Sequence, residues 1–195
     1  MNNSIDESNE VIMNTEVSPL AMTVALISFS MLFATLILGY FIFRFSNSAW
    51  PPIGVPKISL SMPLISTFFI LISSIGIEFA KYYFKKSNVR LLRRTILAVI
   101  FFGGCYFISQ INFWTYLNVI NLATHTGIYA SILHGFTWIH SFHVACAVVL
   151  LISIFFLSFK ERFSGFHYGF VMNSFTFWHF LTLLWLLLFL IMFVF

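Results

Sequence analysis

Two histidines lie three residues apart inside the apolar stretch WIHSFHVACAVVL, residues 138–150. An imidazole ring can ligate a metal, hold a haem iron, carry a proton or form a hydrogen bond between helices. A polar side chain in such surroundings is costly unless it has a partner. His140 and His143 are therefore the first candidates for a functional site, and the rest of the chain must indicate which chemistry they serve.

The spacing of the histidines favours hydrogen bonding over metal or haem binding. His140 and His143 fall on one face of a helix, whereas His134, nine residues before His143, falls on the opposite face. A haem held between two helices needs histidines at one depth, and the predicted helix ends place His143 and His179 about two turns apart. HxxH also lacks the carboxylate or further histidines that complete an iron or zinc site. We expect polar packing groups, with a proton path and a metal or haem ligand as alternatives.

Glu78, in SSIGIEFAKYY, is the one acid predicted inside a span. Membrane proteins that relay protons usually place Asp or Glu deep in a helix. Glu78 instead falls near a predicted helix end with Lys81 three residues later, which favours an interfacial ion pair. Cys105 and Cys146 both lie in apolar runs and are expected to be packing residues.

The elements that must position these residues are transmembrane helices. Of the 195 residues 60% are hydrophobic, 20% are aromatic and only 8% are charged, and the mean hydropathy of +0.96 lies far outside the range of soluble domains. The apolar runs do not alternate, which excludes a β-barrel. We predict an all-α integral membrane bundle of five transmembrane helices, at 20–43, 60–82, 95–117, 129–158 and 172–195.

The charged residues predict the topology. Eight of the ten Lys and Arg residues lie on the side that holds the N-terminus and the loops at 83–94 and 159–171. By the positive-inside rule the N-terminus is cytoplasmic and the C-terminus periplasmic, and the net charge of +4 needs no nucleic-acid partner. Residues 1–19 hold four of the six acids and lack a signal-peptide pattern, so we predict a disordered cytoplasmic tail before a transmembrane domain at 20–195.

Four motifs follow one another along the chain. AWPPIG follows the first predicted helix, FISQINFW lies in the third, WIHSFHVACAVV in the fourth and FWHFLTLLWLLLFLIMFVF in the fifth. In this order they resemble subunit III of the haem-copper oxidases, the cytochrome c oxidase subunit 3 family, in its short bacterial form with five helices. The resemblance covers nearly everything from residue 20 to 195. It identifies as motif residues Trp50, Gln110, His140, His143, Trp178, His179, Phe180 and Trp185.

The resemblance implies an accessory subunit that is not an enzyme by itself. It implies that the chain binds no haem or metal, packs against the catalytic subunit of a proton-pumping terminal oxidase in the bacterial cytoplasmic membrane, and leaves haem and copper to the partner subunits I and II. Cytochrome c or quinol would supply the electrons, and a larger respiratory supercomplex is a further expected partner.

The resemblance also implies bound phospholipid. The three prolines of SAWPPIGVPKIS are expected to splay the first two helices away from the other three and so form an apolar cleft. Basic residues at the cytoplasmic rim are candidate contacts for anionic headgroups: Lys81, Lys85, Arg93 and Arg94.

The chain departs from the family where many members carry an acid, at Phe29, Phe113 and Thr182. Roles that need those carboxylates are not expected here, whereas packing and lipid roles are compatible with Phe and Thr. One alternative function is an accessory membrane subunit of a nitric oxide reductase. The other is an independent transporter or membrane haem protein, for which the scattered histidines and the lack of internal repeats give little support.

Overall fold

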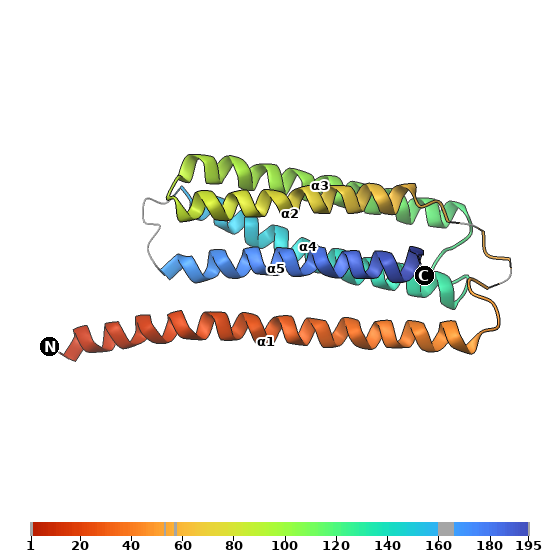
Figure 1. Ribbon diagram of the computed structural model, residues 1–195, viewed down its shortest axis with the longest axis horizontal. Helices are drawn as coiled ribbons and strands as arrows, with labels where there is room; N and C mark the ends of the chain where they lie inside the picture. Colours follow the sequence, from red (N-terminus) through yellow and green to blue (C-terminus); the bar gives the residue numbers. More distant parts are fainter. Residues whose placement is uncertain (1, 53, 57, 160–165, 195) are drawn as a thin grey trace.

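Five long helices run side by side in the computed structural model of the chain (Figure 1), which describes residues 2–52, 54–56, 58–159 and 166–194. The helices are α1 (Asn2–Ser46), α2 (Ser61–Lys85), α3 (Val89–Val119), α4 (Ile128–Leu157) and α5 (Phe166–Phe189). A short π-helix, Leu190–Val194, continues α5. The described ranges contain no strand, and each helix includes a stretch long and apolar enough to cross a membrane. The predicted fold class is confirmed.

α3 and α5 begin earlier than the sequence predicts, at Val89 and Phe166 instead of 95 and 172. Their charge led the sequence-based prediction to place the arginines of α3 in a loop. Their long apolar stems, however, can lie along a helix end while the charged groups reach water. Asn88 also caps this end, because its side-chain oxygen accepts a hydrogen bond from the Leu91 N–H at 3.2 Å.

α1 begins at Asn2, where the sequence predicts a disordered tail over residues 1–19. Its apolar span is Leu20–Ser46, so the start of the span agrees with the prediction. An existing helix extends at little cost, because each added residue gains a backbone hydrogen bond without a new nucleus. The amino-acid composition of residues 1–19 does not predict that the helix continues through them. The division into a tail and a transmembrane domain at residue 20 stays a prediction.

α2 belongs to a compact unit with α3, α4 and α5, and α1 lies along the opposite side of α4 and α5 (Figure 1). The expectation that α1 and α2 splay away together is therefore wrong for α2, which packs on α3 and α5. Prolines stiffen the connection at 47–60, but they do not decide where the following helix packs. The small-residue face of α2 decides it, because Ser66, Ser73 and Ala80 are buried there.

Tyr40 is the main attachment of α1. Tyr40 and Phe33 are the buried residues among the side chains described for this helix. The Tyr40 hydroxyl donates to the carbonyl oxygen of Ile191 at 3.2 Å, and it accepts hydrogen bonds from Trp50 Nε1 at 3.2 Å and Arg44 Nη1 at 3.1 Å. These bonds join the end of α1, the connection that follows it and the π-helix that continues α5.

Gly76 sets the distance between α2 and α3. A Cβ atom at this position would lie 2.7 Å from Val99 Cγ2, whereas a Cβ at Gly104 on α3 would meet nothing within 4 Å. We expect Gly76→Ala to lower the free energy of unfolding by about 1–3 kcal/mol relative to Gly104→Ala, since a β-branched neighbour cannot move easily. Thermal unfolding of both variants in one detergent measures the difference, and equal midpoints would contradict the close approach.

Candidate functional site

His140 lies fully buried where α3, α4 and α5 meet. Its Nε2 lies 3.0 Å from the carbonyl oxygen of Leu181, which can only accept, so Nε2–H donates. In the neutral ring Nδ1 then accepts a hydrogen bond from the Tyr106 hydroxyl at 3.0 Å. The ring of Trp185 packs against both His140 and Tyr106. Both ring nitrogens are thus engaged within the protein.

His143 turns toward α1 and not toward His140's partners. Its Nδ1 donates to the Ile139 carbonyl within its own helix at 2.7 Å. The ring meets Phe29 edge-on, with centroids 4.7 Å apart, and Phe33 at 5.7 Å. Phe29 therefore makes an aromatic contact between α1 and α4. It is one of the positions where many members of the family that the sequence resembles carry an acid.

His179 faces α2. Its Nδ1 lies 2.7 Å from Ser74 Oγ, and its Nε2 lies 2.9 Å from Glu78 Oε1, without the alignment of a hydrogen bond. Lys81 Nζ lies 3.8 Å from the same carboxylate oxygen. The predicted pairing of Glu78 with Lys81 is confirmed, and its predicted position at the membrane interface stays a prediction. His179 is the nearer partner of the carboxylate, and the sequence does not indicate it, because contacts between helices leave no spacing signal.

The predicted difference in depth between His143 and His179 is wrong, because α5 begins at Phe166. His179 follows that start by 13 residues, and His143 precedes the end of α4 at Leu157 by 14, so both lie about 20 Å from those ends. Their directions separate them, since one faces α1 and the other α2. Within the described part of the chain, no three His, Cys, Asp or Glu side chains gather as a metal site would require.

The tryptophans of the last motif tie α5 to α2. Trp178 Nε1 donates to Ser73 Oγ at 3.2 Å, and Trp185 Nε1 donates to Thr67 Oγ1 at 2.9 Å. These four side chains are buried. The bonds repeat at a spacing of about two turns along both helices, so the motif residues act as cross-links within the bundle.

Two other motif residues, Trp50 and Gln110, lie in different surroundings. Trp50 lies in the connection after α1, where it hydrogen-bonds Tyr40 and packs edge-on against Tyr129. Gln110 is fully buried on α3, and neither of its amide atoms has a hydrogen-bond partner among the described residues.

Tyr106, the partner of His140, was not predicted as a site residue, because nothing in a single sequence separates it from the other aromatic residues of the spans.

The four basic residues predicted to meet lipid headgroups differ in their surroundings. Arg93 donates from Nε to Ser158 Oγ at 3.0 Å and from Nη2 to the Ser158 carbonyl, and its guanidinium lies over the Phe159 ring. It thereby joins α3 to the end of α4, where a cation is favoured. Lys81 pairs with Glu78. Lys85 and Arg94 are exposed.

Two apolar grooves flank α1. One, of about 610 Å³, lies between α1 and α5, and its lining includes Phe33, Ala34, Phe180 and Leu183. The other, of about 430 Å³, lies between α1 and α4. Such surfaces suit acyl chains better than water or a charged substrate. The arrangement of the described residues joins helices and offers apolar grooves.

Comparisons with known proteins agree with this geometry. The sequence model of the family described as Cytochrome c oxidase subunit III matches residues 9–195. The chain is 27% identical over 177 residues to cytochrome c oxidase subunit 3 of Thermostichus vulcanus, covering 90% of the chain and 86% of the relative. It is 24% identical over 173 residues to the Synechocystis protein of that name, covering 87% and 72%. With the Loxodonta africana protein of that name it shares 30% identity over 146 residues, 74% of the chain but 54% of that relative.

Replacing His140 tests whether it acts as a link between helices. We expect His140→Leu to destabilise the protein by about 1–3 kcal/mol, because two hydrogen bonds are lost and the Tyr106 hydroxyl keeps only its longer one, to Ser141 Oγ at 3.3 Å. His143→Leu, whose bond stays within α4, should cost less. A double-mutant cycle of His140→Leu with Tyr106→Phe, followed by denaturation in detergent, should give a coupling of about 0.5–2 kcal/mol. Additive effects would contradict the assigned pair.

Proposed function

Because the chain belongs to the cytochrome c oxidase subunit III family, and so to the accessory subunits of haem-copper oxidases, we propose that it works there as a non-catalytic subunit. The observation that carries this proposal is the engagement of both His140 nitrogens by Tyr106 and Leu181. Four motif residues hydrogen-bond other helices, which fits a structural role: His140, Trp178, His179 and Trp185. The relatives do not favour the nitric oxide reductase alternative.

The reacting groups of the oxidase belong, on this proposal, to other chains. Haem and copper lie in the catalytic subunits I and II, which are the expected partners of this subunit, together with larger respiratory assemblies. Its contribution to electron transfer and proton translocation is then indirect: it stabilises the catalytic subunit and the surrounding lipid.

Purification of the assembly through a tag on this chain tests the function. We expect the haem absorbance and copper of a terminal oxidase to co-purify, and we expect the subunit stripped from its partners to retain no stoichiometric haem, iron, copper or zinc. Absorbance spectra, metal analysis and mass spectrometry of the co-purified chains measure both. A nitric oxide reductase among the partners, or a haem band in the stripped subunit, would contradict the proposal.

The proposed location is the bacterial inner membrane, with the N-terminus cytoplasmic and the C-terminus periplasmic. The motivation is the unequal distribution of Lys and Arg between the two sides. An alkaline phosphatase reporter fused after Phe195 should be active, because that enzyme folds in an oxidising compartment. An inactive phosphatase fusion, paired with a fluorescent cytoplasmic reporter at the same position, would reverse the orientation.

Phospholipid is the proposed occupant of the two grooves beside α1. This replaces the expected cleft between the first two helices and the other three, because α2 packs within the compact unit. Arg94 and Lys85 stay candidates for anionic headgroups at the other end of the bundle, while Arg93 is drawn into contacts with α4.

Filling one groove should displace lipid. Ala34 is exposed and lines the groove between α1 and α5, whereas Ala98 is exposed on α3 and lines neither groove. We expect Ala34→Phe to lower the phospholipid retained per purified complex and to shorten the number of turnovers before inactivation. Ala98→Phe is the matched control and should change neither. Phosphate analysis measures the retained lipid, and turnover counting measures the operating lifetime. An unchanged lipid content in Ala34→Phe would show that this groove is not a lipid site.

A further inference from the structure

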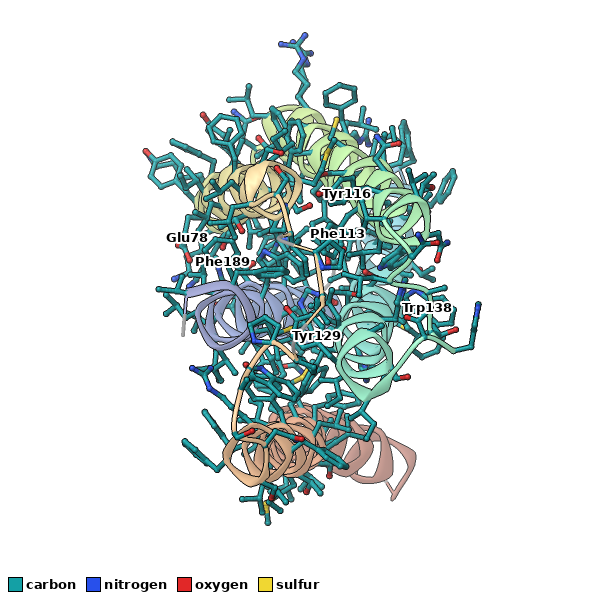
Figure 2. The ribbon with its side chains drawn as sticks, turned by 90° about the vertical axis from the view of Figure 1, so that its right-hand side faces the viewer. Glu78, Phe113, Tyr116, Tyr129, Trp138 and Phe189 are labelled. Carbon is teal, nitrogen blue, oxygen red and sulfur yellow. The ribbon has the colours of Figure 1, made fainter. Side chains whose placement is uncertain are left out.

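The carboxylate of Glu78 lies on an outer flank of the bundle, inside the apolar part of α2. Its side chain is 58% exposed, and Figure 2 shows it at the edge where α2 and α5 lie side by side. Lys85, the last residue of α2, lies seven positions further along the helix, which is a rise of about 10 Å. Exposed residues near it in sequence on α2 are apolar, including Ile75 and Phe79.

The direction of the side chain turns the carboxylate away from the Lys85 end of α2. The Cα–Cβ bonds of a helix tilt toward its N-terminus. On α2 that direction leads away from Lys85 and toward the middle of the span. Long Lys and Arg side chains near helix ends can reach the interface, but a glutamate that points the other way is too short to do so.

The contacts of Glu78 leave one oxygen without a partner. His179 Nε2 at 2.9 Å and Lys81 Nζ at 3.8 Å both approach Oε1. Ser74 holds the other side of the His179 ring. No hydrogen bond or ion pair from the described residues reaches Oε2. Ionisable groups inside membranes are nearly always paired or directed at protein, because hydrocarbon offers no hydrogen bond.

We propose that a transmembrane helix of a partner subunit covers this flank in the assembled complex and directs a hydrogen-bond donor at Glu78 Oε2. Arg, Lys, an indole or a hydroxyl would supply the donor, and apolar side chains would cover Ile75 and Phe79. The proposal rests on the proposed function for the existence of a partner, and it adds the face and the chemistry of the contact. An acyl chain fits the apolar neighbours, but it has no donor for the carboxylate.

Photo-crosslinking identifies what covers the flank. The photoreactive amino acid p-benzoylphenylalanine is placed at Phe79 or, as a matched control, at Phe142, which is exposed on α4. Figure 2 places Glu78 and Trp138, one turn before Phe142 on α4, on opposite flanks. In native membranes we expect Phe79 to give a protein adduct in a helix that carries a donor, and Phe142 to give lipid adducts. Lipid adducts alone at Phe79, or equal protein adducts at both positions, would overturn the proposal.

Glu78 variants test the chemistry of the contact. Loss of one hydrogen bond between membrane helices should lower the fraction of partner retained in detergent about three- to twentyfold in Glu78→Leu. Glu78→Gln keeps an acceptor oxygen and should retain more, and Lys81→Gln, which leaves the carboxylate in place, should resemble the unchanged protein. Equal retention in Glu78→Leu and the unchanged protein would overturn the proposed donor.

The outcomes separate this inference from the proposed function. A protein adduct at Phe79 with a chain that is not part of a haem-copper oxidase would refute the function and keep the flank as an interface. Co-purified oxidase with lipid adducts at Phe79 would keep the function and refute the flank.

Discussion

The hydrogen bonds from Tyr106 to His140 and from His140 to the Leu181 carbonyl join α3, α4 and α5 at one buried point. A membrane offers no water to satisfy polar groups, so a buried imidazole must find its partners within the protein. This constraint fixes the rotation of α4 against its neighbours. Trp178 and Trp185 then complete the unit by bonding hydroxyls of α2. A histidine pair that looks like a metal or haem motif therefore belongs to the packing of the bundle.

The position of α1 separates two kinds of surface. The compact unit of α2 to α5 buries several polar residues. α1 buries Phe33 and Tyr40 against it, contacts His143 through Phe29, and is flanked by apolar grooves. A helix attached in this way can accommodate acyl chains without disturbing the core. The other flank, at Glu78, presents a carboxylate beside the exposed apolar side chains of Ile75 and Phe79. Lipid and protein neighbours are thus expected on different sides of the molecule, as an accessory subunit between a catalytic partner and the bilayer requires.

The sequence predicted the elements better than their contacts. Apolar run lengths and Lys and Arg positions are local properties, and they predicted five helices and the pair of Glu78 with Lys81. The start of α5 was missed by six residues, and with it the depth of His179, because polar and aromatic residues at helix ends look like loop. The placement of α2 and the role of Tyr106 depend on side chains that meet across helices. The spacing of prolines and the number of aromatic residues contain no information about these contacts between helices.

Electron microscopy of the purified assembly tests the central claim most directly, because it shows side chains, cofactors and neighbours together. The account predicts a haem-copper catalytic subunit beside this chain, His140 bonded to Tyr106 and to the Leu181 carbonyl, and density for haem and copper confined to the partner chains. Metal or haem density on His140, His143 or His179, or an assembly without a haem-copper subunit, would contradict it.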